Sequence, residues 1–195
     1  MKTNLGEQLL EFVAAEKLVI GICNGFQTLV NLGLLPGIDG DFTQRSVALL
    51  HNDCGNFRDD WVHLRINPDS PCVFTRGMSH LYLPVRHGEG KFFTDAAVLE
   101  RLIQNQQVVM QYAGPDGAPA GGRFPDNPNG AMADIAGICD PTGRVFGLMP
   151  HPEAYNDPTN HPGWTRDRSL LQRYRKSPAP GVQLLKNAVD FVRNG

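Results

Sequence analysis

The chain has 195 residues, a length typical of one domain with a sizeable hydrophobic core, and we expect a single domain over residues 1–195. Its 18 basic and 20 acidic residues give a formal charge of −2 without a basic run, which argues against nucleic-acid and membrane-surface partners. No apolar stretch is long enough to span a membrane, and the first residues do not resemble a signal peptide. The four cysteines lack Cys-x-x-Cys spacing, so we expect free thiols, no metal site and a cytoplasmic location.

The first elements expected along the chain are a helix, a buried strand and a second helix. A capping box of Asn4 and Glu7 would begin the first helix, whose apolar face is Leu5, Leu9, Phe12 and Val13. The apolar run Leu18–Ile22 predicts a buried strand, and a helix follows it with apolar residues at Phe26, Leu29 and Val30.

The middle of the chain is richer in strands. Alternation over residues 61–66 predicts a half-exposed strand with Trp61, His63 and Arg65 on one side. Further strands are expected at 108–112 and in a hairpin of 135–140 and 144–148, with a long loop at 114–130. The last predicted element is an amphipathic helix over about 182–192, with Leu185, Val189 and Val192 on one face.

The segment Gly21-Ile22-Cys23-Asn24-Gly25 joins the first predicted strand to the following helix. This is the cysteine form of a nucleophile elbow, a strained turn that lifts a nucleophile out of a sheet. Glycines two positions on either side would relieve crowding of the backbone, and the positive end of the helix dipole would favour an anionic sulfur. The alternative is an ordinary buried cysteine. We interpret Cys23 as the nucleophile.

A general base for this cysteine is expected at His151. The residue follows the apolar run 145–149, at a sheet edge where open α/β folds place their sites. In extended backbone, residues two apart point the same way, so Glu153 could orient the imidazole. The flanking prolines would stiffen this segment, as a base held in place requires. The alternative interpretation of His151 is a solvated loop histidine beside an incidental acid.

Several motifs together resemble one known family. Gly-Ile-Cys-Asn-Gly-Phe-Gln and Met-Pro-His-Pro-Glu resemble the class I (triad) glutamine amidotransferases, and more narrowly the glutaminase component of phosphoribosylformylglycinamidine synthase. Further matching segments are Asn52-Asp53-Cys54-Gly55-Asn56-Phe57, Trp61-Val62, Leu83-Pro84-Val85-Arg86-His87-Gly88-Glu89-Gly90-Lys91-Phe92, Gln111-Tyr112 and Asn127-Pro128-Asn129-Gly130. The resemblance covers roughly residues 5 to 155 and implies an α/β, flavodoxin-like three-layer sandwich.

The resemblance also implies a reaction and partners. Cys23 would attack the side-chain amide of glutamine, and His151 with Glu153 would transfer the proton to the departing ammonia. Asn24 would give a backbone N–H to the oxyanion hole, and Gln27 matches the position that touches glutamine. Ammonia would pass to an ATP-dependent synthetase in purine biosynthesis, and that partner would bind ATP and magnesium, since this chain has no phosphate-loop motif.

Two other polar residues, His87 and Glu89, alternate with Gly88 and Gly90. They are predicted either to line the glutamine pocket or the ammonia exit, or to form a tight polar turn.

The sequence departs from the family pattern at its start. Members of the family have several parallel strands and a Gly-Gly loop before the elbow strand, and the Gly-Gly loop supplies a second oxyanion donor. Here 17 residues precede that strand, so the chain is interpreted as N-terminally truncated relative to the family. Loss of one oxyanion donor typically costs about 10²–10³ in rate.

Three hypotheses therefore stand. The first is a glutaminase component that delivers ammonia to a synthetase. The second is a related cysteine hydrolase or peptidase, against which Gln27 and the 52–57 segment argue. The third is an inactive fragment or docking module that retains the triad.

Overall fold

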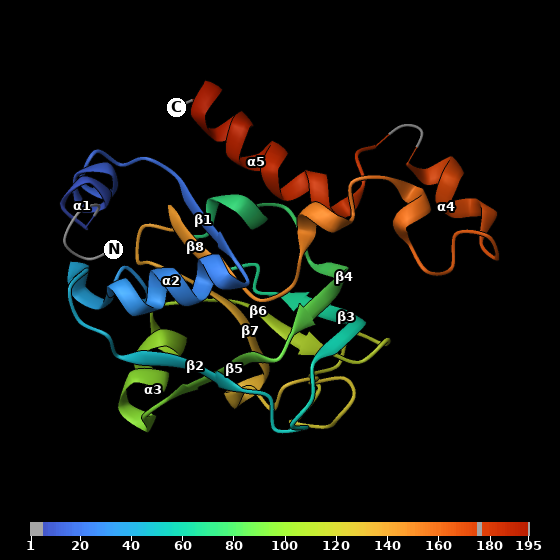
Figure 1. Ribbon diagram of the computed structural model, residues 1–195. Helices are drawn as coiled ribbons and strands as arrows, with labels where there is room; N and C mark the ends of the chain where they lie inside the picture. Colours follow the sequence, from blue (N-terminus) through green and yellow to red (C-terminus); the bar gives the residue numbers. More distant parts are fainter. Residues whose placement is uncertain (1–5, 175–176, 195) are drawn as a thin grey trace.

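A computed structural model describes residues 6–174 and 177–194 (Figure 1). The α-helices are α1 (Gly6–Ala14), α2 (Asn24–Leu32), α3 (Ala96–Gln104), α4 (Arg168–Arg173) and α5 (Pro180–Asn194). The strands are β1 (Val19–Ile22), β2 (Val47–His51), β3 (Arg58–Ile66), β4 (His80–His87), β5 (Glu89–Thr94), β6 (Val108–Ala113), β7 (Ile135–Cys139) and β8 (Val145–Leu148). Short 3₁₀ turns include η2 (Val73–Thr75), η4 (Pro152–Ala154) and η5 (Pro158–Asn160).

The main sheet has six strands in the order β1-β8-β7-β6-β3-β4. The pair β1 and β8 is parallel, and the other neighbouring pairs are antiparallel. Strands β2 and β5 form a separate antiparallel ribbon. Because β5 follows β4 after Gly88 alone, one extended stretch leaves the main sheet and enters this ribbon.

Helices and turns cover both faces of the sheet, as Figure 1 shows. On β8, Gly147 faces α2 so closely that an added Cβ would lie 2.1 Å from the Phe26 ring. The preceding residue on the strand, Phe146, points to the opposite face and contacts Phe74 of η2, with ring centroids 5.7 Å apart. Helix α5 packs on η2, where Asn187 donates hydrogen bonds to the carbonyls of Phe74 and Arg76. The expected α/β layered fold is confirmed.

Strand β1 lies at the edge of the main sheet. Only Gly21 of its four residues is fully buried, so the expectation of a buried strand was wrong. Helix α1 has no fully buried residue, and Phe12, expected on its apolar face, is 47% exposed. Residues 4 and 5 of the predicted first helix lie outside the described residues. An edge strand has a neighbour on one side alone, which explains its partial exposure.

The remaining predicted elements are found close to their expected positions. Residues 62, 64 and 66 of β3 are buried, while Trp61, His63 and Arg65 lie on the more exposed side. Strands β7 and β8 form the predicted hairpin, and no helix or strand interrupts residues 114–130. Leu185, Val189 and Val192 of α5 are 41%, 47% and 68% exposed, and this helix packs instead through Gly181 and Leu184. No helix in the described ranges is long and apolar enough to cross a membrane.

Candidate active site

The turn from β1 to α2 places Cys23 at the N-terminus of the helix. Its backbone has φ 51° and ψ −107°, a region that residues with a Cβ rarely adopt, at a cost of about 1–3 kcal/mol. The N–H of Cys23 donates to the carbonyl of Leu148 on β8 at 2.8 Å, and its carbonyl accepts from Gln27 at 3.1 Å. The strained elbow predicted from the sequence is present, and Cys23 as a residue is 8% exposed.

The two glycines of the elbow have different roles. A Cβ on Gly21 would lie 2.7 Å from the backbone of Gly25 and 2.6 Å from Leu29, so this position requires glycine. A Cβ on Gly25 would meet nothing within 4 Å, and the φ of Gly25 is not positive. Crowding therefore explains Gly21, whereas the expectation that it also explains Gly25 was wrong.

The imidazole of His151 is held by Glu153. Nδ1 of His151 lies 2.6 Å from Oε1 of Glu153, which selects the tautomer with the proton on Nδ1. The N–H of His151 also donates to the carbonyl of Pro84 on β4 at 2.8 Å. The contact with Glu153 was predicted, but the backbone turns into η4 at Pro152 instead of remaining extended. Gly181 of α5 supports η4, since a Cβ there would lie 1.8 Å from the carbonyl oxygen of Pro152.

Cys23 and His151 line the same cavity, of about 390 Å³. Interaction with the Cys23 thiol raises the pKa of His151, burial opposes this, and Glu153 adds to the increase. Nε2 of His151 is buried and has no hydrogen-bond partner among the described residues. The thiol points to the carbonyl oxygen of Arg86 instead, at 3.9 Å. Such contacts are commonly long in free enzymes and shorten when substrate binds.

His87 is a buried, neutral histidine in the wall of this cavity. Its Nδ1 lies 3.1 Å from Oδ1 of Asn52, whose Nδ2 donates to the carbonyl of His87 at 2.8 Å. Burial, and then the neighbouring His151, lower the pKa of His87 to about 4. Nε2 of His87 is buried without a partner among the described residues. His87 ends β4, so the alternative of a tight polar turn was wrong for this residue.

Gln27 and Glu89 also line the cavity and contact each other. Nε2 of Gln27 lies 3.4 Å from Oε2 of Glu89, and Nδ1 of His51 lies 3.3 Å from Oε1. Glu89 begins β5 and its side chain is 53% exposed. Asn24, the remaining predicted site residue, also lines the cavity and is the first residue of α2. The structure thus brings all seven predicted site residues together: Cys23, Asn24, Gln27, His87, Glu89, His151 and Glu153.

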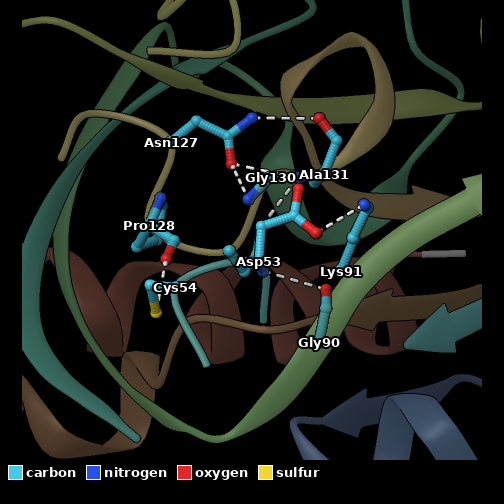
Figure 2. A network of polar contacts seen from close by, with 9 residues as sticks. Asp53, Cys54, Gly90, Lys91, Asn127, Pro128, Gly130 and Ala131 are labelled. Carbon is cyan, nitrogen blue, oxygen red and sulfur yellow. Dashed lines mark hydrogen bonds and ion pairs between the residues drawn. The ribbon is translucent and has the colours of Figure 1, made fainter. Parts of the chain in front are cut away.

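A network of polar contacts, shown in Figure 2, joins the 52–57 segment to the 127–131 loop and to β5. Asp53 accepts a hydrogen bond from Lys91 at 2.6 Å, and its N–H donates to the carbonyl of Asn129 at 3.1 Å. The Cys54 thiol lies 3.8 Å from the carbonyl oxygen of Pro128. Gly130 has φ +77°, and a Cβ there would lie 2.0 Å from Asp53.

Buried amides fix the same loop from within. Asn129 donates to the carbonyl of Gly90 at 2.9 Å and to the hydroxyl of Tyr112 at 3.3 Å. Asn127 accepts from the N–H groups of Gly130 and Ala131, while Asp134 accepts from Asn127 and from the N–H groups of Gly121 and Gly122. Sequence reasoning did not assign the roles of Asn52, Tyr112 or Asp134. The segments 52–57, 111–112 and 127–130, which match the family, were the available signals, and they gave no roles to single residues.

Metal binding finds no support in the described part of the chain, where no group of three or more His, Cys, Asp or Glu side chains could hold an ion.

Comparisons with known proteins agree with this geometry. Residues 1–192 match the family described as the CobB/CobQ-like glutamine amidotransferase domain. A phosphoribosylformylglycinamidine synthase subunit PurQ from Methanococcus maripaludis is 42% identical, with 98% of this chain and 71% of that protein covered. PurQ from Dehalococcoides mccartyi is 40% identical, with 99% and 71% covered.

A solved structure of PurLQS from Thermotoga maritima has a similar fold, with a TM-score of 0.63 and 25% identity over 96% of this chain and 68% of that one. The family model matches nearly the whole sequence, and the two PurQ relatives are at least 40% identical to it. The chain belongs to the glutamine amidotransferases, as a PurQ-type class I enzyme of purine biosynthesis.

Proposed function

We propose that this protein is the glutaminase component of a phosphoribosylformylglycinamidine synthase and hydrolyses glutamine through Cys23, His151 and Glu153. The observation that carries the proposal is the strained elbow that presents Cys23 to the cavity beside an imidazole already oriented by a carboxylate. A nucleophile, a base and an orienting group in this order are the components of covalent acyl-transfer catalysis.

In the first half-reaction, the sulfur of Cys23 attacks the side-chain carbonyl carbon of glutamine. His151 accepts the thiol proton at Nε2, and Glu153 stabilises the resulting imidazolium through Nδ1. When the C–N bond breaks, His151 returns the proton to the nitrogen, which leaves as ammonia. A water molecule then attacks the thioester, with His151 again as the base, and glutamate and the free thiol result.

Charge on the substrate oxygen needs hydrogen-bond donors during both steps. The N–H of Asn24 belongs to the first turn of α2, where N–H groups have no partner within the helix. It is our proposed oxyanion donor, and the helix dipole would add to the stabilisation. Gln27, His87 and Glu89 would contact glutamine from the remaining walls of the cavity.

The ammonia produced here would serve a synthetase partner. The names of the PurQ relatives and of the PurLQS structure describe subunits of a larger synthase, and we extend that arrangement to this chain. The synthetase would bind ATP and magnesium, whereas this chain would bind glutamine.

The test is alkylation of the protein with an electrophilic glutamine analogue, followed by mass spectrometry of each cysteine. We expect one adduct, at Cys23, whose formation is slowed by excess glutamine. Cys54, Cys72 and Cys139 serve as internal controls, since all four thiols are free. Labelling spread over the other three cysteines, or unaffected by glutamine, would contradict the proposal.

A further inference from the structure

We infer that Cys72 and Cys139 are an oxidisable dithiol pair, between which a reversible disulfide closes and joins the residue before η2 to the end of β7. This inference is independent of the glutaminase proposal, since neither residue lines the cavity that contains Cys23.

Backbone contacts hold the segment that contains Cys72 against the β7–β8 hairpin. The N–H of Val73 donates to the carbonyl of Gly143, in the turn of the hairpin, at 3.0 Å. Gly143 lies so close to the segment that an added Cβ would be 2.1 Å from the carbonyl oxygen of Pro71 and 2.8 Å from the nitrogen of Cys72. The two segments, remote in the sequence, therefore have a fixed approach in the fold.

Within this contact, one serine touches both cysteines. Oγ of Ser70 lies 3.7 Å from the sulfur of Cys139, 69 positions further along the chain. The same oxygen accepts a hydrogen bond from the N–H of Cys72 at 3.3 Å. The two thiols also interact with each other, and this contact, together with burial, raises the pKa of Cys139. Cys72 and Cys139 are thus neighbours through their side chains.

This arrangement differs from that of the other two cysteines. The thiols of Cys23 and Cys54 point to backbone carbonyl oxygens, those of Arg86 and Pro128. A disulfide requires two sulfur atoms that face each other across a fixed backbone, and this requirement is met where Cys72 approaches Cys139.

The oxidant in the proposed reaction is a small-molecule disulfide such as oxidised glutathione. The thiolate of one cysteine attacks a sulfur of the reagent, whose S–S bond breaks, and one glutathione thiol leaves. The second cysteine then attacks the protein sulfur of the mixed disulfide and releases the other glutathione. The two protons of the protein thiols pass to the two released thiols, so the pair loses two electrons and the reagent gains them.

The cross-link would attach the layer that contains α5 to the main sheet. Asn187 of α5 donates to the carbonyls of Phe74 and Arg76, just after Cys72. A disulfide between Cys72 and Cys139 closes a loop of about 70 residues, and long loops constrain the unfolded chain strongly. The oxidised protein should therefore unfold at a higher temperature than the reduced protein.

The experiment maps disulfides by mass spectrometry of tryptic peptides, since trypsin places each cysteine in a different peptide. Cys72 lies in residues 66–76 and Cys139 in residues 124–144. The protein is incubated with reduced and oxidised glutathione in the folded state. In parallel it is refolded from urea in the same mixture, because the two cysteines are only 1% and 0% exposed and the oxidant reaches them when the chain opens.

Wild type is compared with Cys72→Ser and Cys139→Ser, and Cys54→Ser is the matched control, because Cys54 is outside the pair. In wild type and in Cys54→Ser, we expect peptides 66–76 and 124–144 to be joined, and to separate after treatment with dithiothreitol. The cross-linked protein should unfold about 5 °C or more above the reduced form. The cross-link and the shift should both be absent in Cys72→Ser and in Cys139→Ser.

Three results would overturn the inference. They are free thiols at both positions in both incubations, pairing of either cysteine mainly with Cys23 or Cys54, and a cross-linked form no more stable than the reduced one. None of them affects the glutaminase proposal, whose own test is the labelling of Cys23.

Discussion

The elbow and the polar network that contacts the cavity through His87 are built differently. At the elbow, the proposed reactive groups occupy two short segments at the ends of the paired strands β1 and β8, residues 21–27 and 151–153. In the network, contacts join residues far apart in the chain, such as Asn52 with His87 and Cys54 with Pro128, 35 and 74 positions apart. The proposed chemistry thus lies in short motifs, whereas long-range hydrogen bonds join the segments of the network.

The elbow and the network also differ energetically. The elbow keeps Cys23 in a strained backbone conformation, which neighbouring packing must offset. In the network, the buried amides of Asn127 and Asn129 find partners for their N–H groups. Substitutions of the proposed reactive groups should therefore change rates, whereas substitutions in the network, and of the crowded elbow glycine, should change stability.

The largest effect is expected at the nucleophile. Cys23→Ala should lower glutamine hydrolysis by at least about 10³-fold, because no other thiol lines the cavity in the described chain. Thermal unfolding should change little, since alanine keeps the Cβ in the same backbone conformation and the thiol makes one long contact, at 3.9 Å. The assay is glutamate release, and activity near that of wild type would exclude Cys23 as the nucleophile.

Glu153→Gln should slow hydrolysis by about 10²–10³-fold, because an amide no longer stabilises the imidazolium form of His151. Alkylation of Cys23 should remain detectable, since Glu153 orients the base and does not react. Steady-state kinetics and mass spectrometry together make this measurement. An unchanged kcat would require a different orienting residue for His151.

The wall should respond to pH through His87. Its folded-state pKa, about 4, is below the ordinary value of 6.5, so the unfolded chain binds more protons between these values. Stability is then fully present above about pH 6.5 and decreases by up to about 3 kcal/mol as the pH falls to 4.

The measurement is urea unfolding of wild type and His87→Asn across this pH range. Burial also lowers the pKa values of His63, His80 and His161, which contribute in the same direction in both proteins. The difference between wild type and variant isolates His87. Parallel curves would show that burial of His87 does not govern this pH dependence.

The two elbow glycines make a matched pair. Gly21→Ala should destabilise the fold by about 1–3 kcal/mol, because its Cβ would press on the backbone of Gly25. Gly25→Ala should be neutral or stabilising by up to about 1 kcal/mol, because its Cβ meets open space within a helix. Chemical denaturation tests both, and equal destabilisation would contradict this distinction.

The smallest effects should separate two kinds of contact in the polar network of Figure 2. Asn129→Ala removes a buried amide with two partners and should cost about 1–3 kcal/mol of unfolding free energy. Lys91→Met removes a partly exposed ion pair with Asp53 and should cost at most about 1 kcal/mol. A larger cost for Lys91→Met would mean that the ion pair, and not the buried amide, holds the loop.

Several features were predictable because their causes are local. The glycine and apolar pattern around Cys23 specifies a strand, a turn and a helix within 16 residues, and the proline-flanked His151 with Glu153 forms its contact within three. The β7–β8 hairpin follows from the turn residues that connect its strands. The buried face of α5 could not be predicted in this way, because apolar residues occupy more than one face of the helix. Its packing on η2 determines which of these faces is buried.

The sequence by itself determined the family of the protein and supplied the candidates for its reactive groups, since both depend on residue types within short motifs. Tertiary structure decided that β1 is an edge strand, that His87 is buried beside Asn52, and that Glu89 meets Gln27 one turn beyond Cys23. The physical reason is distance along the chain. Burial, pKa shifts and pocket shape arise between segments that the backbone brings together, and no local pattern of residues encodes those distances.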